Sequence, residues 1–265
     1  MIKWVLRSCT LLFWAIFGWL LFSLASGRSS VWIYLGLAAA LLLGLLGSFV
    51  LGLESRIHRL SDRERYTDQD RIRYGNWLAG WVVPFIFNTK VEVKGLEYLD
   101  QVKTGALFPN HQSLMDIGAL LKVVKRPHGF IAKKELDGIF LLSDGMRMID
   151  CEFMDRQDVR QSVKVISNAV KKVKEGRLMV IFPEGTRAVK KEMGLFKAGS
   201  FKVATKAKAD IIPVTFFNTH EFAKRWPRPT VVRMEIHPPI PFAEYENWSP
   251  QEIADRVEAI VKKNL

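Results

Sequence analysis

Two long uncharged stretches stand at the start of the chain. Residues 8–27 and 29–53 contain no charged side chain, and Arg28 separates them. At ~1.5 Å per helical residue each stretch is about 30 Å long or more, which matches the hydrocarbon core of a bilayer. The pattern predicts a membrane helical hairpin over residues 1–53 with its turn at 26–30. A shallow hairpin that enters the membrane without crossing it is an open alternative.

The charges around this hairpin predict its orientation. The turn carries only Arg28, whereas basic residues gather at the two ends, at Lys3, Arg7, Arg56, Arg59, Arg63 and Arg65. Positive flanks favour the cytosolic side of a membrane, so the body of the protein is expected to face the cytosol. A cleaved signal peptide is the competing interpretation of the first stretch. The second apolar stretch, directly after it, argues against cleavage.

The next segment changes character twice. Charges of both signs alternate densely over 54–73, as on a solvated helix or one at headgroup level. Residues 77–87 are apolar again but too short to span a membrane. We therefore predict a juxtamembrane or interfacial helical segment over 54–89, either lying in the interface or packed under the domain that follows.

From residue 90 onward, strand and helix patterns alternate. Short alternating or wholly apolar runs predict strands at 90–94, 105–108, 129–132, 147–150, 178–182, 211–217 and 231–236. A helix is predicted at 201–209, and a capping box of Ser249, Pro250 and Glu252 opens another that reaches the C-terminus. This succession predicts one α/β domain over 90–265, with a sheet covered by helices on both faces.

One predicted helix between these strands has a regular apolar spacing. Val159, Val163, Ile166, Val170 and Val173 recur at steps of four and three residues, which is the spacing of one helix face. Lysines occupy the other side. The pattern therefore predicts a helix with one apolar face over residues 159–173.

Composition narrows the function without naming it. The chain has 265 residues, 49% of them hydrophobic, and a net charge of 39 − 27 = +12. These values exclude a disordered or collagen-like chain and favour anionic partners such as phosphate groups or acidic lipid. Nucleic acid is not an expected partner, because no recognition-helix pattern or basic–aromatic interleaving occurs. Cys9 and Cys151 lie far apart in unlike surroundings, so neither a disulfide framework nor a four-cysteine zinc site is expected.

The first candidate for chemistry follows the predicted strand at 105–108. It reads Asn110-His111-Gln112-Ser113-Leu114-Met115-Asp116. A helix that begins near Gln112 brings the aspartate to the histidine, so the carboxylate holds the imidazole in one tautomer. The pair is then a general base with its orienting partner, and it needs no serine or cysteine nucleophile if the substrate supplies the attacking hydroxyl. On spacing alone, a structural His–Asp hydrogen bond is the alternative.

The second candidate follows the predicted strand at 178–182. It reads Phe182-Pro183-Glu184-Gly185-Thr186-Arg187. A glycine that permits close backbone approach, a hydroxyl and a guanidinium are suited to hold a phosphate. A turn with a surface arginine is the alternative. The sequence contains no P-loop, no Gly-x-Gly-x-x-Gly run and no His-Glu-x-x-His zinc motif.

Together these loops resemble the glycerolphosphate acyltransferase family, and within it the 1-acylglycerol-3-phosphate acyltransferases. The family's Asn-His-x-x-x-x-Asp block matches residues 110–116, and its Phe-Pro-Glu-Gly-Thr-Arg block is complete at 182–187. Further blocks are similar to Phe153-Met154-Asp155-Arg156, Phe196-Lys197-Ala198-Gly199 and Ile212-Pro213-Val214. The resemblance covers residues 91–241 in order. It implies an α/β fold with a mixed sheet flanked by helices.

The resemblance also implies an activity: transfer of an acyl chain from a thioester to the free hydroxyl of lysophosphatidate, giving phosphatidic acid in phospholipid synthesis. It implies that His111 is the base and Asp116 its orienting partner, without an acyl-enzyme. The acceptor's phosphate and glycerol are assigned to Glu184, Gly185, Thr186, Arg187, Arg156, Lys133 and Lys197, with Asn110 and Pro213 as supporting motif positions. Backbone amides near Gln112 are the candidate oxyanion donors.

Several choices stay open at this point. No metal or redox cofactor is implied, and the co-substrate is either acyl-CoA or an acyl carrier protein. Glycerol 3-phosphate or another lysolipid fits the same blocks as acceptor. A membrane-tethered protein that binds anionic lipid without catalysis is the non-enzymatic alternative, and the intact His111–Asp116 pair argues against it. Lysophosphatidate, the acyl thioester and membrane lipid are the expected partners.

Overall fold

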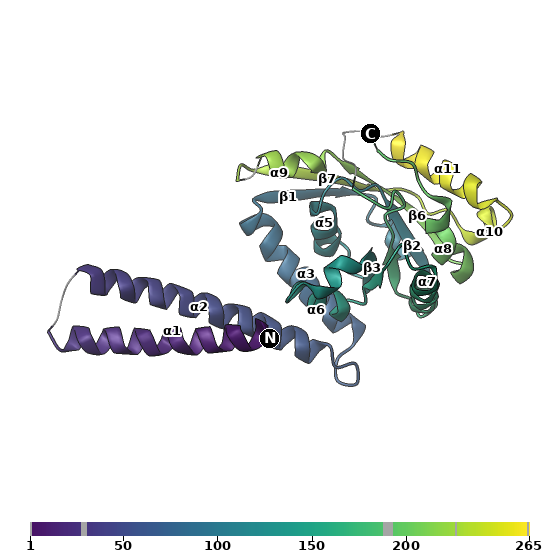
Figure 1. Cartoon of the computed structure of the whole chain (residues 1–265). Coiled ribbons are helices and arrows are strands. Elements are labelled where there is room, and N and C mark those ends of the chain that lie inside the picture. Colours follow the sequence, from purple (N-terminus) through teal and green to yellow (C-terminus); the bar gives the residue numbers. More distant parts are fainter. Residues whose placement is uncertain (1, 28–30, 188–192, 226, 264) are drawn as a thin grey trace. The chain divides into compact units, whose positions relative to one another are not determined.

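The computed structural model describes residues 2–27, 31–187, 193–225, 227–263 and 265, and they belong to two compact units (Figure 1). The boundary between the units lies between Asp62 and Arg63. Each unit is described separately below.

The first unit is a pair of helices, α1 (Ile2–Ala25) and α2 (Val31–Leu60). Small residues of α2 let the helices pack closely: a Cβ at Gly47 would lie 2.5 Å from Thr10 Oγ1, and Gly44 faces the ring of Trp14. The stretch Ile33–Leu60 is long and apolar enough to cross a membrane, and α1 contains the shorter apolar stretch Thr10–Ala25. The predicted helical pair is therefore present.

The bounds of this first unit differ from the prediction in one respect. The predicted hairpin boundary at residue 53 falls inside α2, because the charged residues that follow do not interrupt a helix. Residues 28–30, which were predicted to form most of the turn, lie outside the described residues.

The first helix of the second unit is α3 (Asp68–Trp81). Thr67 and Asp70 form a capping box at its N-terminus. A single π-helical segment, η1 (Val82–Ile86), follows. The buried side chains of this segment include Ile72, Asn76, Ala79 and Val83. Its exposed apolar side chains are Trp77, Trp81, Phe85 and Ile86. The segment thus packs under the domain on one side and keeps an apolar surface exposed on the other.

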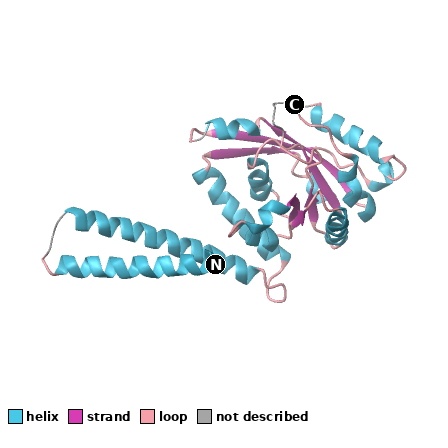
Figure 2. Ribbon diagram, viewed as in Figure 1, coloured by secondary structure: helices cyan, strands magenta, loops and turns pink. Residues whose placement is uncertain are grey.

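A seven-stranded mixed sheet forms the centre of the second unit (Figure 2), in the order β1-β7-β6-β2-β5-β3-β4. The strands are β1 (Thr89–Lys94), β2 (Gly105–Pro109), β3 (His128–Lys133), β4 (Glu152–Met154), β5 (Leu178–Val180), β6 (Asp210–Phe217) and β7 (Thr230–Ile236). β2 pairs in parallel with β5 and β6, whereas β7 runs antiparallel to β6. The mixed α/β sheet implied by the resemblance is confirmed.

Helices cover the sheet on both faces (Figure 1). On one face, α7 (Val159–Lys174), α8 (Lys202–Ala207) and α11 (Pro250–Lys262) enclose an apolar core with the strands. On the other face lies α5 (Met115–Val123), packed against α3. Short helices connect these elements: α4 (Tyr98–Gln101), η2 (Lys134–Gly138), α6 (Leu142–Met148), η3 (Ala198–Phe201), η4 (Thr219–Glu221), α9 (Phe222–Arg225) and α10 (Phe242–Tyr245).

Two local predictions are wrong. Residues 147–150 do not form a strand: Met148 ends α6, and Asp150 adopts φ 66° where the chain turns toward β4. On α7 the fully buried side chains are Val165, Ala169 and Val173, whereas Val159 and Val163 are 74% and 57% exposed. The predicted helix is present and Ile166, Val170 and Val173 pack against the core, so the predicted apolar face is wrong only at Val159 and Val163.

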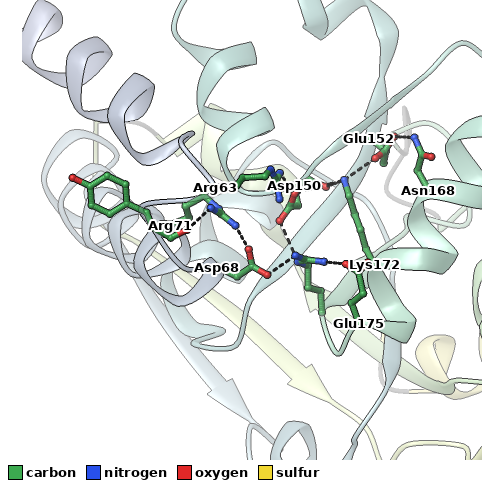
Figure 3. A network of polar contacts seen from close by, with 10 residues as sticks. Arg63, Asp68, Arg71, Asp150, Glu152, Asn168, Lys172 and Glu175 are labelled. Carbon is green, nitrogen blue, oxygen red and sulfur yellow. Dashed lines mark hydrogen bonds and ion pairs between the residues drawn. The ribbon is translucent and has the colours of Figure 1, made fainter.

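An ionic network holds α3 against the region of β4 and α7 (Figure 3). Asp150 pairs with Arg63, Lys172 and Arg177, and Asp68 pairs with Arg71 and Arg177. Glu152 pairs with Lys172, and Glu175 with Arg177. Each of these cations therefore has a carboxylate partner, which is the condition under which charges are tolerated at buried positions. We call these eight residues the ionic network.

Candidate active site

Loops that follow three neighbouring strands meet at one edge of the sheet. β5, β2 and β6 are adjacent and parallel, so the residues after each of them lie at the same edge. Asn110, fully buried, ties the first loop to β6: its Nδ2 donates to Phe216 O at 3.1 Å, and its Oδ1 accepts from Phe216 N at 2.7 Å. The side chain of Asn110 thus fixes the start of the loop that carries His111.

His111 and Asp116 contact each other, with His111 Nδ1 2.9 Å from Asp116 Oδ2. The same Oδ2 accepts the backbone N–H of Gln112 at 2.8 Å and of Ser113 at 2.9 Å. A carboxylate oxygen that accepts two amides is ionised, so Nδ1 carries the imidazole proton and Nε2 keeps its lone pair. This is the tautomer that a general base needs. We call the pair the dyad.

The backbone amides around Gln112 are already bound to other acceptors. Those of Gln112 and Ser113 donate to Asp116, and that of His111 donates to Glu184 Oε1 at 2.6 Å. They are therefore not free to stabilise an oxyanion in this arrangement, contrary to the role that the sequence suggested. The sequence could not show this, because it depends on which side chains fold back onto the loop.

Glu184 joins the two motif loops. Its Oε1 accepts from His111 N, and its Oε2 accepts from Gly194 N at 2.8 Å. The side chain is only 5% exposed, and this burial raises the pKa of the carboxyl, while the two amide hydrogen bonds act in the opposite direction. Phe182 of the same loop stacks on the His111 ring at a centroid distance of 4.0 Å. Glu184 thus positions the base, and its oxygens are not turned to a phosphate.

A cleft opens beside Gly185. It is lined by Arg156, Gly185 and Lys197 together with apolar side chains that include Ile131, Met154, Ile166 and Phe182. Gly185 has φ 79°, and a Cβ there would lie 2.9 Å from Arg156 Nη1 and 3.1 Å from Lys197 Nζ. The backbone conformation therefore favours glycine, and a Cβ there would also displace the ends of the two cationic side chains. We call Arg156, Gly185 and Lys197 the cationic cleft.

The two cations of this cleft form no close ion pair, although the charge of Glu135 acts on Arg156. Among the residues that the structure describes, neither Arg156 nor Lys197 forms an ion pair with a carboxylate. Two cations that converge on one backbone position repel each other, so the arrangement gains most from an anion with several oxygens. A guanidinium and an ammonium beside a glycine are suited to a phosphate monoester.

The remaining predicted phosphate ligands are placed differently. Thr186 and Arg187 follow Gly185 and are exposed, and Lys133 is exposed at the end of β3. These three side chains do not line the cleft, and their roles stay predictions. Pro213 is buried in β6, where it pairs with Phe108 of β2. Its contribution is to the sheet that supports the site.

Sequence reasoning missed Thr219, which contacts Asp116 Oδ1 through its hydroxyl at 2.5 Å. Thr219 belongs to no motif. The sequence does show that it comes shortly after a predicted strand, as the two motif loops do. Only the order of strands in the sheet shows that this strand, β6, lies beside β2 and brings Thr219 to Asp116.

Other titratable groups lie outside this site. Burial raises the pKa of the Cys151 thiol to about 12, which makes it a poor nucleophile at neutral pH. His128 is buried at the start of β3, its Nδ1 donates to Arg126 O at 2.9 Å, and burial lowers its pKa to about 4. Within the described part of the chain, no group of three or more His, Cys, Asp or Glu side chains is arranged to hold a metal ion.

Comparison with known families decides the assignment. A family model described as Acyltransferase matches residues 90–217, a range that contains the dyad and the cationic cleft. Over this range the chain is similar to the acyltransferase family. The fold is similar to a crystal structure of the 1-acyl-sn-glycerophosphate (LPA) acyltransferase PlsC from Thermotoga maritima, with a TM-score of 0.63 and 28% identity over 83% of this chain and 87% of that one.

Relatives with curated names point the same way. This chain is 32% identical over 169 residues to a chloroplastic 1-acyl-sn-glycerol-3-phosphate acyltransferase of Arabidopsis thaliana, covering 62% of this chain and 46% of the relative. It is 28% identical over 196 residues to a 1-acyl-sn-glycerol-3-phosphate acyltransferase of Borreliella burgdorferi, covering 72% and 75%. The match spans about half the length of the plant relative, and likewise 50% of a probable 1-acyl-sn-glycerol-3-phosphate acyltransferase of Mycoplasma pneumoniae.

Proposed function

We propose that this acyltransferase moves an acyl chain from a thioester to the free hydroxyl of 1-acylglycerol 3-phosphate, forming phosphatidic acid. One observation carries the proposal: a single loop joins a base to a cationic cleft. Phe182 stacks on His111, and Gly185 of the same loop lines the cleft with Arg156 and Lys197. An acceptor with a hydroxyl and a phosphate on one glycerol needs both groups at short range. The names of the relatives support this acceptor class.

In the proposed reaction, His111 Nε2 takes the proton of the acceptor hydroxyl while that oxygen attacks the thioester carbonyl. The tetrahedral intermediate collapses, the C–S bond breaks, and the departing thiolate takes the proton from the imidazolium. Asp116 keeps the Nδ1 proton in place and stabilises the imidazolium while it exists. Assistance by a general base of this kind contributes ~10²- to 10⁴-fold in rate.

We propose that the donor is a co-substrate, acyl-CoA or an acyl carrier protein, and that no resident cofactor takes part. Proton transfer by the dyad and anion binding by the cationic cleft provide the chemistry that direct transfer requires. An acyl carrier protein would be an additional protein partner. The choice between the two donors is an outcome of the assay below.

We also propose that the acceptor is drawn from the membrane and that the second unit faces the cytosol. The apolar helix α2 supports membrane attachment. The basic flanks of the first unit, which include Arg56 and Arg59, support the cytosolic orientation. Charge on the protein favours anionic lipids, since acceptor and product both carry a phosphate. A reporter fused to the C-terminus, active only in the cytosol, tests the orientation.

The deciding experiment uses the full chain, purified in detergent, with acyl-CoA and with acylated carrier protein as donors. Lysophosphatidate, glycerol 3-phosphate and a monoacylglycerol are compared as acceptors. We expect phosphatidic acid from lysophosphatidate with at least one donor, and poor use of the monoacylglycerol. Efficient transfer to glycerol 3-phosphate alone would instead assign a different acceptor. Binding of lysophosphatidate without transfer from either donor would favour the non-enzymatic alternative.

A further inference from the structure

One buried hydroxyl outside the family's motif blocks touches the dyad. Thr219, which directly follows the turn after β6, is fully buried, and its Oγ1 lies 2.5 Å from Asp116 Oδ1. This is the carboxylate oxygen that His111 does not contact. The preceding residue, Asn218, adopts φ 55°, a left-handed conformation that asparagine tolerates better than most residues. That turn brings Thr219 from the end of β6 to the first turn of α5.

The Thr219 hydroxyl donates its hydrogen bond to Asp116. Gln112 Oε1 is a second acceptor within 3.3 Å of Thr219 Oγ1, but it already accepts the Thr219 backbone N–H at 2.9 Å. The shorter contact and the ionised acceptor both favour Asp116. Asp116 therefore accepts the imidazole and two amides on Oδ2 and the hydroxyl on Oδ1. Both oxygens of the fully buried carboxylate therefore accept hydrogen bonds.

We propose that Thr219 is a positioning residue for the base, and this proposal rests on the acyl transfer proposed above. Its hydroxyl fixes the rotation of the Asp116 carboxylate and offsets part of its charge. The first effect keeps the His111 ring oriented. The second keeps the imidazolium acidic enough to return its proton to the departing thiolate. Thr219 acts through Asp116 and makes no contact with substrate.

Removal of the hydroxyl has a distinctive consequence for pH dependence. Without it, the carboxylate charge acts more strongly on the imidazole, which then holds its proton to higher pH. The acidic limb of the kcat/KM profile should therefore move to higher pH. Two other titratable groups lie nearby: Glu184, which contacts His111 from the second motif loop, and His220, next to Thr219 in sequence. The substitution of Thr219 leaves both of these residues in place. A shift of that limb is thus attributable to the hydroxyl.

The test compares Thr219→Val, which removes the hydroxyl at equal size, with Thr219→Ser, which keeps it. We expect Thr219→Val to lower kcat ~10- to 100-fold, as for loss of a hydrogen bond to a charged group, with the KM of both substrates little changed. Thr219→Ser should stay within a few-fold of wild type. If valine is not accommodated, Thr219→Ala and Thr219→Ser form a second pair that differs by a single hydroxyl and adds no methyl group.

Thr215 provides a matched control. It lies on β6, is also fully buried, and its hydroxyl donates to Val261 O at 3.1 Å and pairs with His237 Nε2 at 2.8 Å. Thr215→Val removes an equally buried hydroxyl that does not contact the dyad. It should lower the thermal stability but leave kcat and the acidic limb of the profile unchanged.

Wild type and His111→Ala are included in the same assay, so that two kinds of failure are distinguishable. A wild-type protein that transfers acyl groups to no acceptor, or a fully active His111→Ala variant, overturns the proposed function itself. An active wild type with folded Thr219→Val at wild-type kcat and pH profile overturns the role of Thr219 alone. Equal losses in Thr219→Val and Thr219→Ser, or in the alanine and serine pair, also overturn it, because the hydroxyl would not be the cause.

Discussion

Two groups of cations in the second unit differ in one decisive respect. In the ionic network, Lys172 and Arg177 each contact carboxylates on neighbouring elements, and Asp150 is shared by three cations. In the cationic cleft, Arg156 and Lys197 converge on Gly185 without a carboxylate partner among the described residues. The first arrangement is complete in the protein alone, whereas we propose that an anionic ligand completes the second.

This difference separates structural charge from functional charge. A buried cation that is paired stabilises the fold only modestly, but loss of its partner is costly because a charge is left buried. Cations without a partner raise the energy of the free protein, and that cost is recovered when an anionic ligand binds. The comparison therefore predicts that changes in the network affect folding and that changes around the cleft and the dyad affect transfer.

The largest effect on transfer is expected at the dyad. His111→Ala should reduce the rate by ~10²- to 10⁴-fold, because a neutral hydroxyl attacks a thioester poorly without a base. Thermal unfolding should change little, since His111 lies at the edge of the sheet and not in its core. Steady-state rates and melting curves of the purified variant check both statements. A folded variant with more than half of the wild-type rate would remove His111 from the mechanism.

The ionic network should respond in the opposite way. Asp150→Asn keeps a residue that tolerates the φ of 66° but removes the charge that three cations share. We expect a loss of about 3–5 kcal/mol in the free energy of unfolding, as for a broken buried ion pair. Activity per folded molecule should be retained. Glu175→Gln, at the more exposed rim of the network, should cost less than about 1 kcal/mol. Equal losses in these two variants would contradict the structural assignment of Asp150.

A titration effect should appear at His128, which is buried at the start of β3. The pKa of His128 is lowered to about 4 by burial, against an ordinary value near 6.5. Between these values the unfolded chain takes up a proton that the folded protein does not, so stability falls as the pH drops from 6.5 toward 4. The loss attributable to His128 reaches roughly 2 kcal/mol at pH 5. Unfolding of wild type and His128→Asn at pH 7 and pH 5 measures it; a parallel decline in both proteins would exclude His128 as the cause.

Local chemistry could be predicted from the sequence, and long-range assembly could not. His111 and Asp116 are close in the chain, so a helix start is sufficient to join them. The cap at Ser249 was confirmed for the same reason: its side chain accepts from Glu252 N within one turn. The two apolar helices of the first unit and most strands also followed from local hydrophobicity.

The features that the sequence could not resolve depend on distant segments. Arg156, Lys197, Lys133 and Arg187 were all predicted to bind the phosphate, but only the folding together of separate loops brings Arg156 and Lys197, and not the other two, to the cleft beside Gly185. Asp150 was predicted to lie in a strand. It lies in a left-handed turn instead, and the cations that contact it there come from other elements, which the local sequence does not show. Thr219 contacts Asp116 only in the observed strand order, with β6 beside β2.

The most direct measurement compares an acceptor with and without its phosphate. Arg156→Ala and Lys197→Ala are assayed with lysophosphatidate and with a monoacylglycerol, and Arg160→Ala, an exposed cation on α7, is the control. We expect kcat/KM for lysophosphatidate to fall by ~10- to 100-fold in each cleft variant, mainly through KM, as for loss of a charge-assisted contact. The low activity toward the monoacylglycerol and the KM of the donor should change little, and Arg160→Ala should behave as wild type. Equal losses with both acceptors would contradict the claim that the cationic cleft binds the acceptor phosphate.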